Sequence, residues 1–258
     1  MTQKVDVGTQ LKAWRERRRL TQLGLSSAAG VSTRHLSFIE TGRSKPSKDM
    51  IIHLSECLDV PLRQRNSLLL AGGHAPAYSQ SALAEAPMAA VSDAINRIID
   101  AHDPFPAVVV DHHWDLIAGN RAVGILTEGS APFLLEPPVN VLRLSLHPEG
   151  MAPRIVNLAQ WRTHVIARLR REVEVTADAQ LGGLLEELRT YPSGGEWHED
   201  EMSSLLVPLR IRAGDTELAM FSTTTVFGTP RDVTLAEIAI ESFYPSDPAT
   251  AEFFRSVG

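Results

Sequence analysis

The stretch "VSTRHLSFIETGRSKPS" at residues 31–47 combines side chain types that can recognise the bases of a nucleic acid. In a helix over "TRHLSFIET", Leu36 and Ile39 would face inward together with Val31. The side chains expected on the opposite face are Thr33, Arg34, Ser37, Phe38 and Thr41. Hydroxyls, one guanidinium and one ring suit base edges and thymine methyl groups in a major groove of DNA.

Flanking residues add groups that can bind phosphate. Arg43 and Lys45 follow the predicted helix in a loop, where they can reach phosphates. Gln22 opens the preceding helix, where its side chain and the first backbone N–H groups can hold another phosphate. Ser32, which directly precedes "TRHLSFIET", is also a candidate DNA-binding residue. Phe38 leaves an alternative open, because an exposed ring could equally anchor a protein partner.

Five short helices within residues 8–72 are predicted to position these groups. The candidate N-caps are Thr9, Thr21, Ser32 and Ser47 (or a start at Lys48), with Pro61 in the first turn of the fifth helix. Gly30 and Gly42 are expected to end the second and third helices. The tight turn between those two helices predicts a helix-turn-helix arrangement.

The interior of this module is predicted from helical spacing. Trp14, Leu36, Ile39 and Leu54 are expected in its core. Glu40 is expected to be structural and to pair with an arginine of the first helix, such as Arg15.

The segment "LTQLGLSSAAGVSTRHLSFIETGRSKPS" resembles the helix-turn-helix of the Cro/CI-type, or XRE, family of repressors. The resemblance covers residues 8–72 and implies binding to a double-stranded DNA operator. A homodimer would then contact two half-sites about one helical turn apart. One departure is Gly24, where the family usually has a helix-forming residue, and glycine there costs up to ~1 kcal/mol relative to alanine.

The balance of basic and acidic residues changes near residue 74, close to the end of the predicted helix-turn-helix domain. Residues 1–74 carry 12 Lys and Arg against 6 Asp and Glu, whereas the remainder carries 13 against 25, so that the whole chain has a net charge of −6. A basic head on an acidic body indicates that only the head meets a polyanion. Cys57 is the only cysteine, and the sequence has neither an apolar signal region nor a membrane-spanning run. We therefore expect a cytoplasmic protein without membrane contact.

The stretch "GGHAPAYSQSALAEAP" at 72–87 is rich in Gly, Ala, Pro and Ser and indicates a linker. We place this linker at residues 76–90, between a helix-turn-helix domain at 1–75 and a second domain at 91–258. In the second domain, residues 108–110 and 114–118 are predicted to be strands around a turn at 111–113. Residues 157–172 and 178–190 are predicted to be amphipathic helices.

Three further strands are predicted late in the chain. "LLVPLRIR" places Leu205, Val207, Leu209 and Ile211 on one face; "ELAMFSTTTVFG" follows a hairpin turn at residues 213–215; and "LAEIAIESFYP" alternates around Ile238 and Ile240. Helices surrounding about five strands predict an α+β domain on an antiparallel sheet.

The order "PAVVVDHHWDLIAGNRAVGIL", "PPVNVLRLSLHPEGMAPRIVNLAQW" and "FSTTTVFGTPRDVTLAEIAIESFYPSD" resembles the MmyB-like ligand-binding domain. The resemblance implies a PAS-like fold that senses a small molecule, and fatty-acid-like ligands are associated with that fold. Candidate pocket residues mix aromatic walls with polar groups; they are Trp114, Asn120, Arg143, His147, Trp161, Phe221 and Phe227. Arg143 could anchor a carboxylate, or it could pair with a structural acid.

Catalytic and metal-binding patterns are weak. His112 and His113 are adjacent in a predicted hairpin, where neighbouring side chains usually point to opposite sides, and "WHEDE" at 197–201 lacks the spacing of a zinc-binding helix. The sequence contains no GxSxG, P-loop or GxGxxG motif. An enzyme acting on a small acid therefore has no supporting motif, and we expect no catalysis, metal or cofactor.

Overall fold

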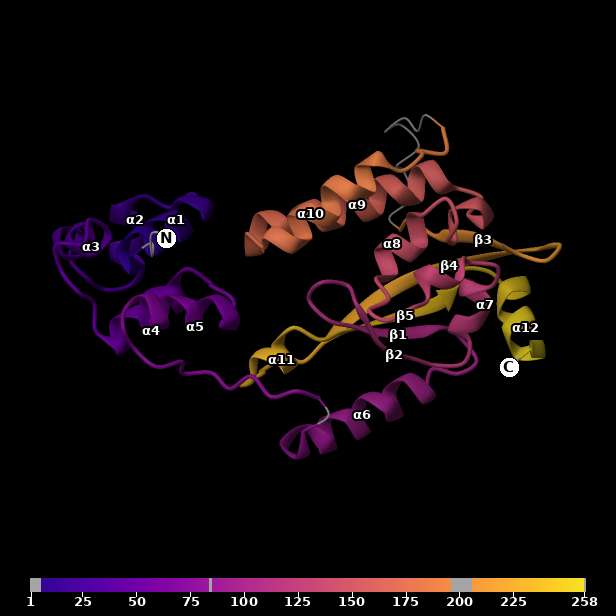
Figure 1. Ribbon diagram of the computed structural model, residues 1–258, viewed down its shortest axis with the longest axis horizontal. Helices are drawn as coiled ribbons and strands as arrows, with labels where there is room; N and C mark the ends of the chain where they lie inside the picture. Colours follow the sequence, from indigo (N-terminus) through magenta and orange to yellow (C-terminus); the bar gives the residue numbers. More distant parts are fainter. Residues whose placement is uncertain (1–5, 84, 196–205, 258) are drawn as a thin grey trace. The chain divides into compact units, whose positions relative to one another are not determined.

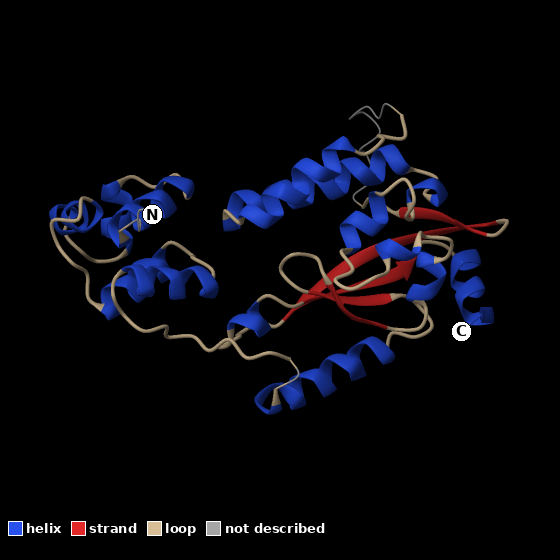
Figure 2. Ribbon diagram, viewed as in Figure 1, coloured by secondary structure: helices blue, strands red, loops and turns tan. Residues whose placement is uncertain are grey.

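The computed structural model describes residues 6–83, 85–195 and 206–257. It divides into two compact units, which Figures 1 and 2 show as ribbons. The first unit holds the chain up to Ser81 with the short segments Glu174–Thr176 and Pro230–Ala236, and the second holds the remainder.

The first unit is built from helices. Its elements are α1 (Val7–Arg17), α2 (Gln22–Ala28), α3 (Thr33–Glu40), α4 (Lys48–Cys57), α5 (Leu62–Ala71) and the short α11 (Val233–Ala236). The five helices predicted within residues 8–72 are thus confirmed. Helices α2 and α3 are joined by a four-residue turn in which Gly30 adopts a φ of 63°. Only glycine adopts such a backbone conformation without steric cost.

Side-chain caps fix where these helices begin. The hydroxyls of Thr21, Ser32 and Ser47 accept hydrogen bonds from the third residue of their helices, over 3.0 to 3.2 Å, as predicted. The prediction of Thr9 as the first cap is wrong. Asp6 caps α1 by accepting hydrogen bonds from the backbone N–H groups of Gly8 and Thr9, at 2.8 and 3.3 Å, so the helix begins at Val7 and Thr9 lies within its first turn.

The core of the first unit confirms the predicted inward residues. Leu36, Ile39 and Leu54 are fully buried, and Trp14 is only 9% exposed. Helices α1 and α3 approach so closely that a Cβ atom at Gly8 would lie 2.0 Å from the carbonyl oxygen of Ile39. The close approach holds α3 with its inner face against α1, so the opposite face of α3 is directed outward.

The second unit contains a five-stranded antiparallel sheet in the order β2-β1-β5-β4-β3. Its strands are β1 (Ala107–Val110), β2 (Leu116–Gly119), β3 (Leu209–Ala213), β4 (Thr216–Val226) and β5 (Ala239–Pro245). Its helices of five or more residues are α6 (Ala89–Asp100), α7 (Val123–Thr127), α8 (Val141–Leu146), α9 (Leu158–Thr176, of which the last three residues belong to the first unit), α10 (Ala179–Thr190) and α12 (Pro248–Val257). The predicted α+β class with an antiparallel sheet is confirmed.

Helices cover both faces of the sheet, as Figure 2 shows. Along β1, Val108 and Val110 join the large core beneath α8, α9 and α10, whereas Ala107 and Val109 join a smaller core with α6. All four residues of β1 are buried, because successive side chains of a strand point to opposite faces and both faces are covered here.

Two strand predictions need correction. Trp114 lies in the β1–β2 turn with a φ of 67°, and the strand begins only at Leu116. The strand predicted over "LLVPLRIR" begins after Pro208, at Leu209, since proline has no N–H to contribute to the ladder. Within it Leu209 and Ile211 are buried as expected; Leu205 lies outside the described residues.

Candidate DNA-binding face and ligand cavity

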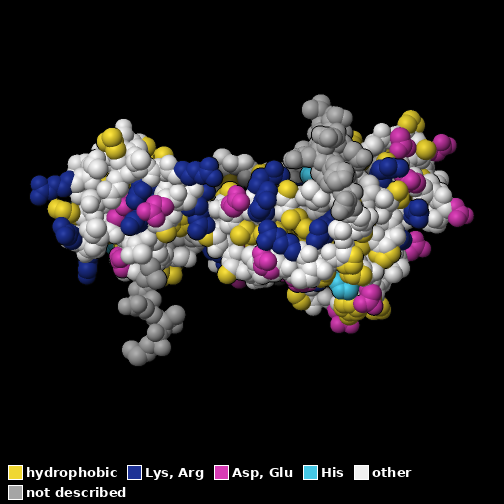
Figure 3. Space-filling model, turned by 90° about the horizontal axis from the view of Figure 1, so that it is seen from above, with side chains coloured by type: hydrophobic (Ala, Val, Ile, Leu, Met, Phe, Trp, Pro, Cys, Tyr) yellow, Lys and Arg dark blue, Asp and Glu magenta, His cyan; other side chains and the backbone are white. Residues whose placement is uncertain are grey.

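The outward face of α3 carries the side chains predicted to read DNA. Thr33, Arg34 and Thr41 are exposed, and Ser37 and Phe38 are half-buried, whereas Leu36 and Ile39 on the other side are fully buried. Arg43 and Lys45 are exposed in the following loop. Figure 3 shows Lys and Arg side chains at the surface of this unit.

Phe38 organises the cations of this face. The guanidinium carbon of Arg34 lies 5.3 Å from the centre of the Phe38 ring, and that of Arg43 lies 6.0 Å away. Both distances are within the range of a cation–π interaction. One ring therefore holds a cation of the helix and a cation of the loop on the same surface.

The polar residues around α3 also make structural hydrogen bonds. The hydroxyls of Thr33 and Ser26 are 2.9 Å apart, and Thr41 donates to the carbonyl oxygen of Ser37 at 2.7 Å. Ser32 accepts from the backbone N–H of His35 as the N-cap. These bonds fix the orientation of α3 and of its side chains.

A buried ion pair joins α3 to α1 and α2. The Nε atom of Arg15 donates to Glu40 at 2.7 Å, and Gln22 Nε2 donates to the same carboxylate at 2.8 Å. Glu40 is thus structural and paired with Arg15, as predicted. Burial acts to raise the pKa of Glu40, but the hydrogen bonds from Arg15 and Gln22 together outweigh it and hold that pKa below its ordinary value.

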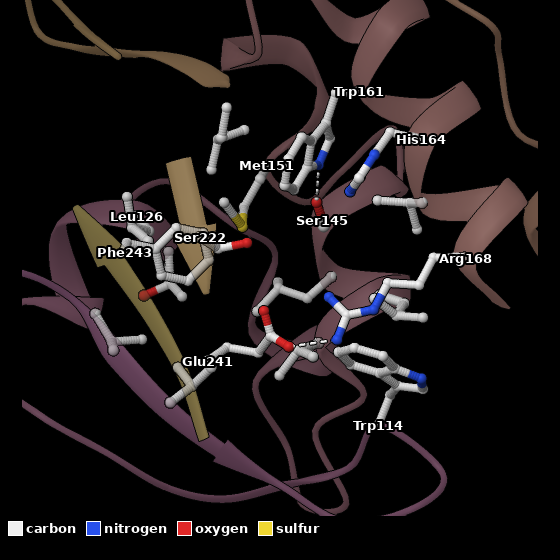
Figure 4. Close-up of a pocket in the computed structure, with 18 residues that line it drawn as sticks. Trp114, Leu126, Ser145, Met151, Trp161, His164, Arg168, Ser222, Glu241 and Phe243 are labelled. Atoms are coloured by element: carbon white, nitrogen blue, oxygen red, sulfur yellow. Dashed lines mark hydrogen bonds and ion pairs between the residues drawn. The ribbon is translucent and has the colours of Figure 1, made fainter. Parts of the chain in front are cut away.

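An apolar cavity of about 90 Å³ lies in the second unit, between the sheet and the helices above it (Figure 4). It has room for several waters or a slender apolar chain. Two of the predicted pocket residues, Trp114 and Trp161, line it. The other lining residues are Val108, Val123, Leu126, Thr127, Val141, Leu142, Leu144, Ser145, Met151, His164, Val165, Arg168, Leu209, Ser222, Glu241 and Phe243.

Helix α9 supplies one wall of the cavity through residues at helical spacing. Trp161, His164, Val165 and Arg168 share one face of the helix, and all four line the cavity. The indole of Trp161 donates to the hydroxyl of Ser145 at 2.9 Å. Burial, followed by the charges of Arg168 and Arg171, lowers the pKa of His164.

The polar end of the cavity is an ion pair between Arg168 and Glu241. Figure 4 shows the guanidinium of Arg168 between the carboxylate of Glu241 and the ring of Trp114. The guanidinium carbon is 4.4 Å from that ring centre, and Thr224 donates to Glu241 at 2.7 Å. The Trp114 indole donates to Glu172 at 2.7 Å, and burial raises the pKa of Glu172 despite that bond. The cation at this end of the cavity is thus paired with Glu241 and faces the ring of Trp114.

Arg143 and His147, which were predicted to line the ligand pocket, lie outside the apolar cavity. They line a more open polar pocket of about 250 Å³ together with Phe133, Leu134, Pro138, Asn140, Glu187 and Tyr191. The Nε and Nη2 atoms of Arg143 donate hydrogen bonds to the two carboxylate oxygens of Glu187, at 2.6 and 2.8 Å. Of the two roles left open for Arg143, this geometry favours pairing with a structural acid.

The remaining predicted pocket residues are not among those lining the cavity. Asn120 is buried, donates to the carbonyl oxygen of Phe105 and accepts from the N–H of Ala107, which fastens the backbone before β1. Phe221 stacks on Tyr244, with ring centres 5.4 Å apart, and Phe227 packs on the core under α6.

Arg168 and Glu241 were missed by sequence reasoning. A signal for Glu241 was present, because it is the one charged residue of the segment "AIESF" in β5, whose other residues are apolar except Ser242. A buried charge in such a strand requires a partner of opposite charge. The sequence does not reveal that this partner is Arg168, which lies 73 positions away.

The turn between β1 and β2 corrects another expectation. The rings of His112 and His113 do not point to opposite sides; their centres are 3.7 Å apart. Residues 111–114 form a turn, in which Trp114 N–H donates to the carbonyl oxygen of Asp111, so the alternation of an extended strand does not apply. The "WHEDE" segment lies outside the described residues.

Two family models match the chain. The model described as helix-turn-helix matches residues 11–64, and the model described as MmyB-like transcription regulator ligand binding domain matches residues 91–257. No curated protein matches the chain. Among the residues that the structure describes, no helix combines the length and apolar character that a membrane span requires. The chain therefore belongs to the family of MmyB-like transcription regulators, with an XRE-type helix-turn-helix for binding DNA and a C-terminal domain for binding a ligand.

Proposed function

We propose that α3 reads a specific operator from the major groove and that the chain acts as a homodimer on two half-sites. The observation that carries the proposal is the division of α3 into a buried face and an outward face with hydroxyls, a cation and a ring. The predicted domains at 1–75 and 91–258 would divide DNA binding from ligand sensing. Each dimer then presents two copies of α3, about one helical turn apart along the DNA.

Arg34→Ala is expected to reduce the preference for the operator over unrelated DNA by about 5- to 150-fold. A bidentate pair between arginine and guanine contributes about 1–3 kcal/mol of discrimination. Arg43→Ala is expected to weaken all sequences alike and to lower the salt dependence, because a phosphate contact carries no sequence information. Fluorescence anisotropy on operator and scrambled duplexes across a salt series measures both effects.

Removing Arg34 also removes a cation from Phe38, so a control is needed. Phe38→Leu keeps an apolar side chain but abolishes the cation–π contacts. If Arg34→Ala leaves the ratio of specific to non-specific affinity unchanged, α3 does not read bases. Complete absence of DNA binding at low salt, with a partner protein retained at high salt, would instead identify the helix face as a protein-binding surface.

We further propose that the cavity binds a small fatty-acid-like molecule with its acidic group at Arg168 and its chain among the apolar walls. The lining supports this, because one cation stands at one end of a cavity that is otherwise mostly apolar. A ligand carboxylate would compete with Glu241 for the guanidinium. Regulation follows if the ligand binds the DNA-competent and incompetent states with different affinities.

Ser222→Leu is expected to abolish binding of octanoate and decanoate while leaving the fold intact. Ser222 lines the cavity from β4, so a leucine there fills space that the ligand would occupy. Thr223→Leu is the matched control, because its side chain is exposed and points to the other face of the same strand. Isothermal titration calorimetry compares the variants, with octanol as the uncharged ligand.

The acidic group is tested separately by Glu241→Gln. If the carboxylate displaces Glu241, this variant binds octanoate more tightly and octanol unchanged. Equal binding of octanoate by wild type and Ser222→Leu would exclude the cavity as the site. Native mass spectrometry of freshly purified protein would identify a co-purifying ligand directly.

A further inference from the structure

The β1–β2 turn gathers metal-ligating side chains that neither DNA binding nor the cavity uses. One ligand atom from each of Asp111, His112 and His113 lies within 4.8 Å of the other two. Ligands about 2.1 Å from a tetrahedral ion are roughly 3.4 Å apart, so small side-chain rotations would close the set. The tight turn already holds both imidazole rings on one side.

Two carboxylates from other elements complete the cluster. Glu237, just before β5, lies 3.2 Å from His112 Nδ1, and Asp178, which caps α10, lies 3.4 Å from His113 Nε2. In metal sites a histidine commonly binds the ion through one ring nitrogen and a carboxylate through the other. Each imidazole therefore has an acidic partner that could either orient the ring or enter the coordination sphere.

Backbone hydrogen bonds hold two of the carboxylates of the cluster in place before any ion binds. Asp111 Oδ1 accepts hydrogen bonds from the backbone N–H groups of His113 and Asp115, at 2.8 and 2.9 Å. Asp178 binds the N–H groups of Gln180 and Leu181 through Oδ1, while its Oδ2 faces His113. Both carboxylates are thus held in place by backbone, so little ordering remains for a metal to impose.

Charge and burial also favour a cation. Three carboxylates surround two imidazoles, and the side chains of His112, His113, Asp178 and Glu237 are only 16 to 26% exposed. Partial burial strengthens the attraction between the carboxylates and a divalent ion, yet leaves a path for the ion to enter.

We propose that Asp111, His112 and His113, supported by Asp178 and Glu237, bind one divalent transition-metal ion of the Zn²⁺ type. Imidazole with carboxylate ligands suits Zn²⁺ and its neighbours rather than Mg²⁺ or Ca²⁺, which prefer oxygen ligands. The ion would tie the β1–β2 turn to the start of α10 and to the segment before β5. Trp114 follows His113 in that turn and lines the cavity. By restricting the motion of the turn, the ion would also restrict the motion of this part of the cavity wall.

The first experiment is titration of metal-free, untagged full-length protein with ZnCl₂ by isothermal calorimetry. We expect saturable binding of one ion per chain. Titration with Co²⁺ gives an independent readout, because its visible absorption reports the geometry and ligand types of the site. Absence of saturable Zn²⁺ binding would overturn the proposal.

Variants locate the site. Asp111→Asn keeps an acceptor for the two backbone N–H groups but loses the charge, and we expect at least about 10-fold weaker Zn²⁺ binding. His112→Ala/His113→Ala should abolish it, while His74→Ala, outside the cluster, serves as the matched control. Far-UV circular dichroism and thermal melting verify the fold of each variant. If folded Asp111→Asn and the folded double variant both bind Zn²⁺ as tightly as wild type, the ion binds elsewhere and the proposal is overturned. If, in addition, only His74→Ala loses Zn²⁺ binding, the ion binds at His74.

Discussion

Replacing Glu40 with alanine is expected to destabilise the first unit by about 3–5 kcal/mol. The variant would leave Arg15, which is 7% exposed, as a buried cation without its carboxylate. Gln22 would lose its acceptor at the same time. Urea unfolding followed by circular dichroism measures the loss, and hydrogen exchange in peptides from α1 and α3 assigns it to this unit.

The double variant Arg15→Met/Glu40→Leu distinguishes two causes of the lost stability: a buried charge without a partner, and the loss of side-chain packing. Replacing both partners with apolar residues of similar volume is often neutral or stabilising, so we expect most of the stability to return. A double variant as unstable as Glu40→Ala would show that packing around the pair dominates.

Acid should remove the difference between wild type and Glu40→Ala. Because the folded-state pKa of Glu40 is lowered, its contribution to stability is fully present above its ordinary value of 4.5 and is lost as the pH falls through the folded pKa. Unfolding measured across this acidic range should therefore show the two free energies converging. A constant difference would contradict the assigned role of the carboxylate.

Replacing Arg168 with alanine is expected to destabilise the second unit by about 3 kcal/mol, the lower end for breaking a buried pair. The Glu241 side chain is 6% exposed and would keep Thr224 as a hydrogen-bond donor, while the Arg168 side chain is 26% exposed and already partly solvated. Arg170→Ala is the matched control, since Arg170 is exposed on the same helix and should change stability by less than about 0.5 kcal/mol.

Arg168→Ala should also change how stability depends on pH. Burial raises the pKa of Glu172, and the charge of Arg168 opposes that rise, so the variant should raise it further. A carboxyl with a raised folded-state pKa stabilises the protein at low pH, and that contribution is lost as the pH rises through the folded pKa. The variant should therefore lose stability with rising pH over a wider range than wild type; parallel profiles would contradict this coupling.

The first unit was predictable because its signals are local. Thr21, Ser32 and Ser47 lie directly before the helices they cap, and the spacing of Leu36 and Ile39 fixes which face of α3 is buried. The error at Thr9 amounts to less than one turn of helix, because Asp6 is an equally suitable capping residue three positions earlier.

The cavity was less predictable because strand neighbours face opposite sides. The aromatic ring of Phe221 makes it a candidate from its residue type, yet the adjacent Ser222 lines the cavity, because the register of β4 decides which of the two faces it. Arg168 and Glu241 meet only because α9 lies over β5, a tertiary contact that residue types do not encode. Trp114 and Trp161 line the cavity, but the turn that holds Trp114 was read as a strand.

The hydrogen bond between Gln22 and Glu40 has a consequence for the entropy of DNA binding. A mobile glutamine that must be immobilised at an interface typically costs about 0.5–1.5 kcal/mol. Glu40 already holds the Gln22 side chain in the protein without DNA. In the proposed phosphate contact, the entropy of this side chain is therefore lost when the protein folds and not when it binds DNA. The same carboxylate that stabilises the first unit would thereby preorganise its DNA-binding surface.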